Sequence, residues 1–263
     1  MRTDLNAVDF LGVEFANVTY EEAAAELDSL SRSDSFSFVV TPNVDHVVML
    51  HEGEDEAVRQ QFKAAYEAAA LRLCDSRILQ VLAKIQGTDL KVVTGSDLTA
   101  LLFTGGHFNG RKVAIIGGDN AMVLELRVRF PEVKFVQHIP PMGALKNPDA
   151  AIEVETFLAS QSCEYALFAF GSPQSEIIAH QCAKAGHSRG VGLCIGASIE
   201  FILGRKARAP AWVQNARLEW AFRLLSEPKR LWKRYLVAGP RIALIALRDF
   251  CALNKEKPSK KGA

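Results

Sequence analysis

The stretch that decides the fold is YALFAFGSPQSEIIAHQCAKAGHSRGVGLCIGAS, which runs from residue 165 to residue 198. Tyr165–Phe170 is a continuous apolar run that predicts a buried strand, and it ends in a Gly-Ser-Pro turn. A helical pattern follows over Glu176–Ala185, and Val191–Ile195 predicts a second buried strand. Two buried strands joined by a helix form a parallel βαβ unit.

The same alternation extends toward the N-terminus. Further strands are predicted over Ser35–Thr41, Ala70–Leu73, Lys112–Ile116 and Lys134–Gln137. Helices are predicted over Thr19–Ser31, Val47–Ala69, Ser76–Gln86 and Ala121–Phe130. We therefore expect an α/β fold with a parallel-sheet, Rossmann-like core of βαβ units over residues 1–207, divided into halves of about 1–105 and 106–207.

Composition narrows the class of protein. With 263 residues and 49% hydrophobic content, the chain can bury one large core or two modest ones. No window holds 18 uninterrupted apolar residues, and the first residues lack the apolar run of a signal peptide. The five cysteines are scattered and never spaced as Cys-x-x-Cys, which predicts reduced thiols in a cytoplasmic protein and argues against a structural zinc site.

Basic charge is concentrated in the last quarter of the chain. Gly204–Ala263 holds 15 Lys and Arg against four acids, a local charge of 15 − 4 = +11, so the rest carries 1 − 11 = −10. Within Pro228–Leu236, Leu, Trp and Tyr side chains fall on one helical face and Lys and Arg on the other. We expect residues 208–263 to form a basic amphipathic helical appendage that contacts an anionic membrane surface, with Lys255–Ala263 a disordered end.

The composition of this tail is compatible with two other interpretations. A surface helix could bury its aromatic side in the core, and nucleic acid would also satisfy the positive charge. No nucleic-acid motif accompanies the charge, and the aromatic residues lie opposite the basic ones rather than between them, which argues against nucleic acid.

Polar or glycine-rich residues follow four of the predicted strands, where ligands bind in parallel sheets. They are Thr41-Pro42-Asn43, Cys74-Asp75-Ser76, Gly117-Gly118-Asp119 and Gly171-Ser172-Pro173-Gln174. The Gly-Gly turn lacks the full GxGxxG spacing of a dinucleotide site and is explained as well by tight-turn geometry. Neither a P-loop nor a GxSxG nucleophile elbow is present.

Together these blocks resemble the WecG/TagA/CpsF glycosyltransferases (glycosyltransferase family 26). The matching segments are Thr41-Pro42-Asn43, Cys74-Asp75-Ser76, Val93–Leu98, Val113–Gly118, Gly171-Ser172-Pro173-x-x-Glu176, Gly196–Gly204 and Arg208–Tyr235. The resemblance implies transfer of a sugar from a UDP-sugar donor to a polyprenyl-diphosphate-linked sugar acceptor at the cytoplasmic membrane face, in surface polysaccharide or teichoic-acid synthesis. It implies UDP-N-acetylmannosamine, UDP-N-acetylmannosaminuronate or UDP-glucose as donor, and leaves a homo-oligomer open.

The resemblance also assigns roles within the site. Asp75 matches the catalytic carboxylate, a base that takes the proton of the acceptor hydroxyl in a single inverting displacement. Its plainer interpretation is the N-cap of the helix at Ser76–Gln86. Thr41 and Asn43 match a polar pair that binds the sugars, although both also suit a turn around Pro42.

Stabilisation of the departing UDP needs positive charge. No Asp-x-Asp pair follows a strand, which predicts catalysis without a metal or other cofactor, and guanidinium groups bind diphosphate bidentately. The candidates in the tail are Arg208, Arg223, Arg230 and Arg234, which could instead bind anionic lipid.

Three positions depart from the family pattern. Asp75 is followed by Ser76-Arg77 where the family has glycine, Val92 stands beside Lys91 where it has arginine, and Gln174-Ser175 replace Lys-Gln. Arg77, Gln174 and Ser175 are the candidate substrate-binding residues at these positions. Either the donor sugar differs from N-acetylmannosamine-type donors, or Arg77 and Gln174 substitute for the lost contacts. The alternative function is that of a non-catalytic UDP-sugar or lipid-binding relative.

Overall fold

The computed structural model describes residues 6–53, 55–141, 143–147, 149–206, 213 and 239–256. The strands are β1 (Ala7–Phe10), β2 (Val13–Ala16), β3 (Phe36–Val40), β4 (Leu71–Arg72), β5 (Lys112–Gly117), β6 (Lys134–His138), β7 (Tyr165–Ala169) and β8 (Gly190–Cys194). The helices are α1 (Tyr20–Ser31), α2 (Val44–Glu52), α3 (Glu56–Ala68), α4 (Arg77–Ile85), α5 (Gly95–Thr104), α6 (Asn120–Arg129), α7 (Asp149–Gln161), α8 (Gln174–Ala185), α9 (Ser198–Ile202) and α13 (Gly239–Glu256), with a 3-10 turn at Ala144–Lys146.

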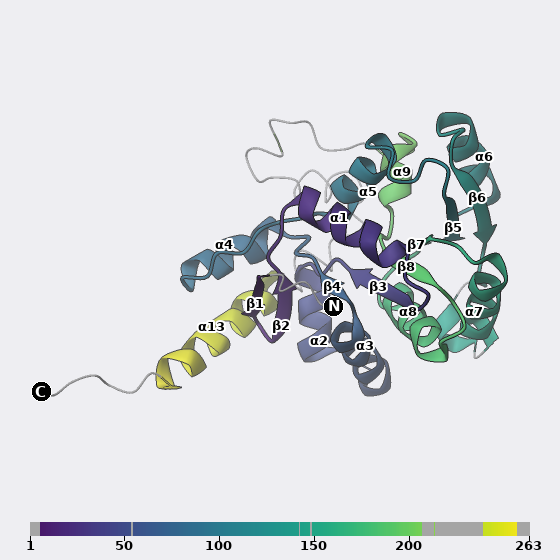
Figure 1. Cartoon of the computed structure of the whole chain (residues 1–263). Helices are drawn as coiled ribbons and strands as arrows, with labels where there is room; N and C mark the ends of the chain where they lie inside the picture. The colour runs from purple at the N-terminus through teal and green to yellow at the C-terminus, as the bar shows by residue number, and fades with distance from the viewer. Residues whose placement is uncertain are drawn as a thin grey trace, which may run out of the picture.

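A parallel sheet forms the centre of the molecule. Within the described ranges it has six strands in the order β4-β3-β8-β7-β5-β6, and every pairing in it is parallel. Helices lie on both faces of this sheet (Figure 1), as parallel strands require to cover their apolar side chains. The predicted α/β core and all six of its strands are confirmed, although β4 is shorter than predicted.

Alternation along each strand divides the core between the two faces. Ala114 and Ile116 of β5 belong to a buried cluster that includes residues of α2, α3, α7, α8 and α13. Val113 and Ile115 belong to a second cluster with residues of α1, α5, α6 and α9. Successive side chains of a strand point to opposite faces, so a continuous apolar run is what a sheet covered on both sides needs.

Polar caps set where the helices begin. Thr19 and Glu22 form a capping box at the start of α1, which confirms the helix predicted there. The segment predicted as mainly helical over Val47–Ala69 is two helices, because α2 ends before Gly53 and the Asp55 side chain caps α3.

Several elements were not predicted. The antiparallel hairpin β1–β2 precedes the core, and helices α5, α7 and α9 were also missed. Helix α13 confirms a helix within the appendage predicted over residues 208–263. Lys255 and Glu256 lie in α13, so the prediction of disorder from Lys255 onward is wrong for these two residues. The predicted helix over Pro228–Leu236 lies outside the described residues.

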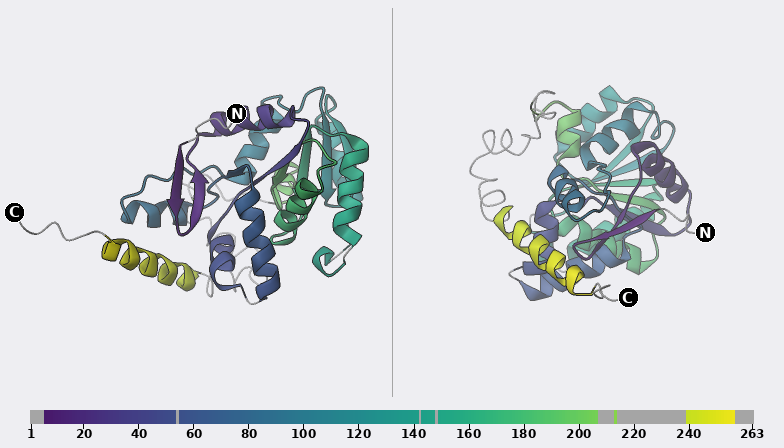
Figure 2. Two further views of the ribbon diagram at one scale, coloured as in Figure 1. Left: turned by 60° about the horizontal axis from the view of Figure 1, so that its bottom comes forward. Right: turned by 90° about the vertical axis from the view of Figure 1, so that its left-hand side faces the viewer.

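Helix α13 belongs to the predicted tail but packs on the core beside α2 and α4 (Figure 2). Ile242, Ile245 and Ala246 are buried in the cluster on that face of the sheet. The Gln86 side-chain amide, just after α4, donates to the Ala246 carbonyl at 2.9 Å. Among the described residues, no helix is both long and apolar enough to span a bilayer.

Gly190 gives a test of the central strand. It starts β8 with φ +81°, and a Cβ there would lie 2.4 Å from the Glu164 carbonyl oxygen and 2.6 Å from that of Cys163. Gly190→Ala should therefore lower the free energy of unfolding by more than about 2 kcal/mol, because backbone must move. Gly186 has φ +77° with open space around it, so Gly186→Ala should cost only about 1 kcal/mol. Equal losses in urea denaturation would contradict this account of β8.

Candidate functional site

Four neighbouring strands bring the predicted residues to one edge of the sheet. The order β4-β3-β8-β7 places the carboxyl ends of these strands side by side. Asp75 follows β4, Thr41 and Asn43 follow β3, Gly196 follows β8, and Gly171 follows β7. Residues from both halves of the sequence thus meet in one place, as expected for a ligand site of a parallel sheet.

Asp75 is half-buried, and backbone hydrogen bonds hold it between the segment after β3 and the segment before α5. Its N–H donates to the Pro42 carbonyl at 2.9 Å, and the carbonyl of Cys74 accepts from the Val93 N–H at 2.9 Å. The N-cap of α4 is Ser76, whose hydroxyl accepts from the Leu79 N–H at 3.2 Å. Ser76, and not Asp75, therefore caps α4, and the alternative role of Asp75 as this cap is wrong.

Thr41 and Asn43 both have structural hydrogen bonds. The buried Thr41 hydroxyl donates to the Cys194 carbonyl at 3.2 Å, which joins the ends of β3 and β8. The Asn43 side-chain oxygen Oδ1 caps α2 by accepting from the N–H groups of Asp45 at 3.0 Å and His46 at 3.4 Å. Both residues lie at the predicted edge, and their contact with sugars stays a prediction.

Gln174 and Ser175, both predicted to bind substrate, differ in their exposure at the start of α8. Gln174 is half-buried at the first position of α8, whereas Ser175 is only 2% exposed and its hydroxyl donates to Glu176 Oε2 at 3.0 Å. The geometry therefore favours Gln174 over Ser175 as a contact for substrate. Arg77 is exposed at the first residue of α4, two positions beyond Asp75.

A layer of buried polar groups lies beneath this edge. Glu176 is only 2% exposed, and burial raises the pKa of its carboxyl group to about 7. The phenol of Tyr66, from α3, is within hydrogen-bond distance of His46 Nδ1 at 2.8 Å. Burial raises the pKa of Tyr66 well above its ordinary value, and the nearby negative charges of Glu176, Cys194 and Asp75 raise it further.

The sequence patterns did not identify Tyr66 as a site residue or assign a role to Glu176. A tyrosine in an amphipathic helix is ordinarily a core residue, so the sequence held no signal for Tyr66. The signal for Glu176 was its position three residues beyond the strand-end turn Gly171-Ser172-Pro173.

A second polar group lies on the other side of Asp75. The Tyr20 phenol oxygen accepts from the Thr94 N–H at 3.0 Å, and the Thr94 hydroxyl donates to Asp97 Oδ2 at 2.8 Å. Partial burial raises the pKa of Tyr20, and the charges of Asp97 and Asp75 add to the rise. Thr94 is also the N-cap of α5, so this contact holds the starts of α1 and α5 together near the candidate base.

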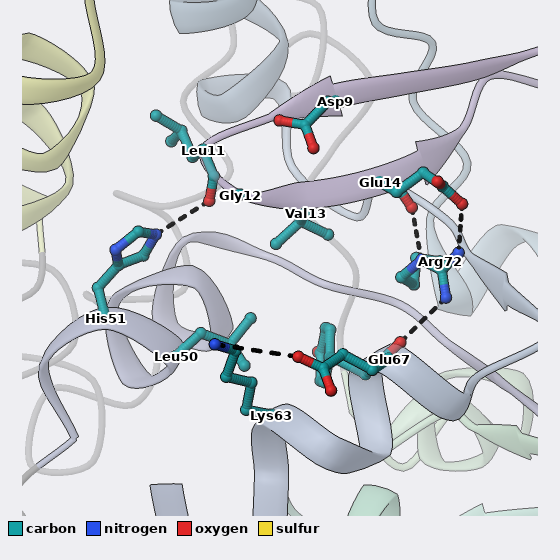
Figure 3. A pocket seen from close by; sticks show the side chains of 11 residues that line it. Asp9, Leu11, Gly12, Val13, Glu14, Leu50, His51, Lys63, Glu67 and Arg72 are labelled. Atoms are coloured by element: carbon teal, nitrogen blue, oxygen red, sulfur yellow. Dashed lines mark hydrogen bonds and ion pairs between the residues drawn. The ribbon is translucent and has the colours of Figure 1, made fainter. Parts of the chain in front are cut away.

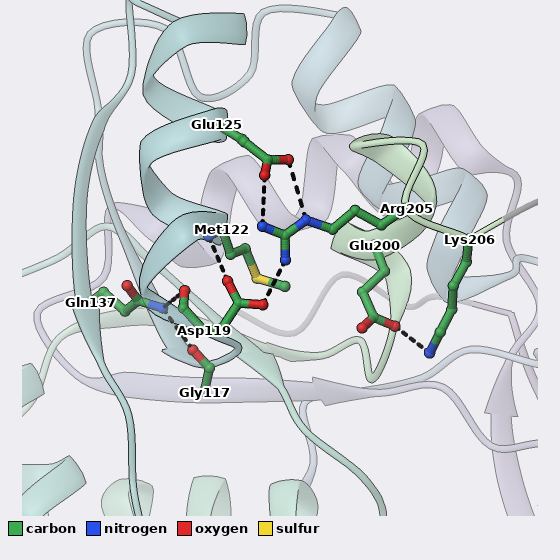
Figure 4. Close-up of polar contacts among 8 residues, drawn as sticks. All are labelled: Gly117, Asp119, Met122, Glu125, Gln137, Glu200, Arg205 and Lys206. Atoms are coloured by element: carbon green, nitrogen blue, oxygen red, sulfur yellow. Dashed lines mark hydrogen bonds and ion pairs between the residues drawn. The ribbon is translucent and has the colours of Figure 1, made fainter.

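The Gly117-Gly118-Asp119 turn at the end of β5 is a tight turn held by an ion-pair cluster (Figure 4). Both glycines have positive φ, and a Cβ on Gly118 would lie 2.5 Å from Met122 Sδ. Arg205 binds Asp119 Oδ2 at 2.7 Å and Glu125 Oε1 at 2.8 Å. The chain thus reaches the start of its predicted tail fastened to α6 at this edge of the sheet.

An open hollow of ≈ 510 Å³ lies between the β1–β2 hairpin and helices α2 and α3 (Figure 3). Its lining carries charges of both signs, in which Arg72 pairs with Glu14 at 2.8 Å and Lys63 with Glu67 at 3.9 Å. No residue predicted for the site lines it. Tyr66 is the residue of the buried polar layer that also borders this hollow.

Arg208, Arg223, Arg230 and Arg234, predicted to bind the diphosphate, all lie outside the described residues. Among the described residues, no group of three or more His, Cys, Asp and Glu side chains is arranged to hold a metal ion. Cys182 and Cys194 are buried and have free thiols.

Comparison with known proteins gives two results. The model of the glycosyl transferase WecG/TagA/CpsF family matches residues 8–256. The N-acetylglucosaminyldiphosphoundecaprenol N-acetyl-beta-D-mannosaminyltransferases of Staphylococcus aureus strains MRSA252 and MW2 are each 25% identical to the chain over 240 residues, which covers 88% of this chain and 89% of each relative.

Glu176 generates a prediction about stability. Its raised pKa means that the folded state disfavours the ionised carboxylate, so stability is lost as the pH rises from the ordinary value of 4.5 to about 7 and is then constant. Glu176→Gln removes this loss. The stability of the variant relative to the wild type should increase by up to about 3 kcal/mol between pH 4 and pH 8.

Urea denaturation across this pH range measures the effect. Glu164→Gln is a matched control, because Glu164 directly precedes β7 at the opposite end of the sheet, where its carboxylate accepts from the Lys112 N–H. A difference between Glu176→Gln and the wild type that stays the same at every pH would contradict the prediction.

Proposed function

The chain belongs to the glycosyl transferase WecG/TagA/CpsF family, and from this premise we propose that it transfers a sugar from a UDP-sugar to a polyprenyl-diphosphate-linked sugar. The observation that carries the proposal is the convergence of the family's motifs at the carboxyl ends of β4, β3, β8 and β7, with Asp75 among them and not engaged as a helix cap.

The two Staphylococcus aureus relatives support a finer statement of the substrates. Their names specify N-acetylglucosaminyl-diphosphoundecaprenol as acceptor and N-acetylmannosamine as the transferred sugar. We propose the same class of acceptor for this chain, in the synthesis of a cell-surface polymer. We propose UDP-N-acetylmannosamine as the donor ahead of UDP-N-acetylmannosaminuronate and UDP-glucose. Because Ser76, Val92 and Ser175 depart from the family pattern, the identity of the donor sugar is the first property to test.

The proposed reaction is a single displacement at the anomeric carbon. An acceptor hydroxyl forms the new C–O bond while Asp75 takes its proton, and the bond from the anomeric carbon to the UDP oxygen breaks with its electron pair going to UDP. Attack opposite the leaving group inverts the anomeric configuration. In this scheme Asn43 and Gln174, both half-buried at the same edge, bind sugar hydroxyls.

The departing diphosphate needs cations. The range described before the tail ends at Lys206, near the end of β5. Arg205, next to it, forms ion pairs with Asp119 and Glu125. The tail therefore starts from the same edge of the sheet as the candidate site. This supports Arg208, Arg223, Arg230 and Arg234 as the diphosphate ligands in a reaction that needs no metal.

Peripheral binding to an anionic membrane is the second part of the proposal. Helices α4 and α13, which are joined by the Gln86 hydrogen bond, together expose large apolar side chains. These are Ile78, Ile85, Leu244, Leu247 and Phe250, each at least 40% exposed. Exposed basic residues adjoin three of them in sequence, namely Arg77, Lys84 and Arg248. Apolar side chains edged by cations fit a bilayer surface that carries negative charge.

Asp75→Asn tests the proposed chemistry. The amide keeps the shape of the side chain but cannot accept the proton, so transfer should fall by roughly 10²–10⁴-fold. Turnover of UDP-N-acetylmannosamine with a synthetic lipid-diphosphate N-acetylglucosamine measures the loss, and calorimetry should find UDP binding nearly unchanged. Retention of more than about a tenth of the activity would remove Asp75 as the base. Tight UDP-sugar binding by a wild type that transfers no sugar would favour the non-catalytic relative.

The membrane proposal is tested on α13. Replacing both Leu247 and Phe250 with Ser should weaken sedimentation with vesicles containing anionic lipid by roughly tenfold or more, because burial of these side chains in the interface is lost. Transfer to a short, water-soluble acceptor should remain. Val128→Ser is the control, since Val128 is 85% exposed on α6, away from this surface. If the control weakens vesicle binding as much as the α13 variant, this surface is not the docking face.

A further inference from the structure

We propose that Arg77 binds the diphosphate of the lipid-linked acceptor, on the path by which the polyprenyl chain runs from the candidate site to the bilayer. This inference rests on the proposed function. The sequence identifies Arg77 only as a candidate substrate-binding residue beside Asp75. Its place at the start of α4, between the candidate base and the exposed apolar side chains of that helix, assigns it to one part of one substrate.

Helix α4 joins the candidate site to the proposed membrane-facing surface. Its N-cap Ser76 directly follows Asp75. Just beyond its last residue, the Gln86 side-chain amide donates to the Ala246 carbonyl of α13 at 2.9 Å. Both helices project from the same side of the molecule (Figure 1). A bound acceptor must extend between the same two places, because its sugar reacts at the candidate base while its polyprenyl chain stays in the bilayer.

The exposed residues of α4 place cations beside apolar side chains. Arg77 and Ile78 are exposed in its first turn, and Lys84 and Ile85 are exposed in its last turn. The two pairs are 84 − 77 = 7 residues apart, close to two helical turns, so they share one face over about 10 Å. A cation next to an isoleucine matches a lipid in which a charged diphosphate adjoins an apolar chain.

The guanidinium group of Arg77 is available for a ligand. Among the described residues, no hydrogen bond or ion pair engages its side chain. The cations on either side of it in the sequence are engaged. Arg72 pairs with Glu14 at 2.8 Å. Lys91 lies 3.8 Å from Glu22. A guanidinium group without a protein partner can bind a diphosphate bidentately and gives up no ion pair to do so.

Two diphosphates take part in the proposed reaction, and the geometry favours the one on the acceptor. The Cα atoms of Asp75 and Arg77 are at most about 7 Å apart, and in the acceptor a single sugar ring separates the reacting hydroxyl from the diphosphate. In a single displacement the attacking oxygen and the leaving oxygen lie on opposite sides of the anomeric carbon. A cation on the acceptor side of the base is therefore directed away from the diphosphate of UDP.

The two diphosphates predict different kinetic effects of losing Arg77. No bond to the acceptor diphosphate breaks, so its charge is the same in the ground state and in the transition state. The negative charge on UDP grows as its bond to the anomeric carbon breaks. A cation on the acceptor therefore supplies uniform binding, which lowers KM, whereas a cation on UDP raises kcat.

The experiment measures kcat and KM for the full-length protein with UDP-N-acetylmannosamine and two water-soluble acceptors. One is N-acetylglucosamine on a short alkyl diphosphate, and the other is the alkyl glycoside without the diphosphate. Arg77→Ala should raise KM for the first acceptor roughly ten- to a hundredfold. The kcat, the KM for the donor and the KM for the glycoside should stay as in the wild type.

Two further variants refine the measurement. Arg77→Lys should recover only part of the loss, because an ammonium group keeps the charge but not the bidentate geometry. Arg189→Ala is the matched control and should behave as wild type, since Arg189 is exposed directly before β8, at the amino end of the sheet. Because Arg77 is exposed, Arg77→Ala should also match the wild type in urea denaturation.

Other sources of phosphate give different outcomes. A fall in kcat or a rise in the KM for the donor would assign Arg77 to UDP, and an equal rise in KM for both acceptors would assign it to the sugar. If the only loss is in sedimentation with anionic vesicles that contain no acceptor, Arg77 is a lipid contact. Each of these results, or an unchanged KM for the diphosphate acceptor, overturns the proposal.

Calorimetry with the alkyl-diphosphate acceptor in the presence of UDP provides a readout without turnover. The wild type should bind this acceptor, and Arg77→Ala should bind it roughly ten- to a hundredfold more weakly. A wild type that binds the acceptor but transfers no sugar refutes the proposed function, and the difference between the two proteins then still decides the role of Arg77. A wild type that does not bind this acceptor overturns the proposal for Arg77.

Discussion

The pairing of β3 with β8 is the constraint on which the site depends. These strands come from opposite ends of the core sequence and pair from Phe36↔Gly190 to Val39↔Leu193. A side chain at position 192 would displace two rings, since a Cβ there would lie 2.7 Å from Phe36 Cζ and 2.9 Å from Phe168 Cε2. Where the pair ends, Thr41 bonds the carbonyl of Cys194, so the two halves of the candidate site share one rigid boundary.

Sequence patterns predicted the sheet because its strands are buried on both faces and therefore read as apolar runs. The hairpin β1–β2 escaped prediction for a physical reason as well. Its two-residue loop, Leu11-Gly12, has positive φ at both positions, but leucine at the first hides the turn that Asn-Gly would have signalled. The charge pattern predicted a C-terminal helical appendage but not the packing of α13, in which Ile242 and Ile245 are buried in the core.

The candidate site was predictable only in its outer layer. Asp75, Asn43 and Gln174 lie three to five residues after the end of a strand. The rule that ligands bind at the carboxyl ends of parallel strands therefore finds them without coordinates. Tyr66 and Glu176 are 176 − 66 = 110 residues apart, and no local pattern relates them. Whether a carboxylic acid is buried at 2% exposure or solvated decides its chemistry, and only tertiary packing determines that.

The two attachments of the tail bear on how it could act in catalysis. Arg205 ties one end of the undescribed segment to α6 on the β5 side of the sheet, and α13 packs against α2 on the other side. Holding a segment at both ends reduces the chain entropy that it loses when it orders over a substrate. Cations carried between such attachments can bind a diphosphate at a smaller entropic cost than cations on a free terminus. The proposed diphosphate ligands Arg208, Arg223, Arg230 and Arg234 lie between these two attachments in the sequence.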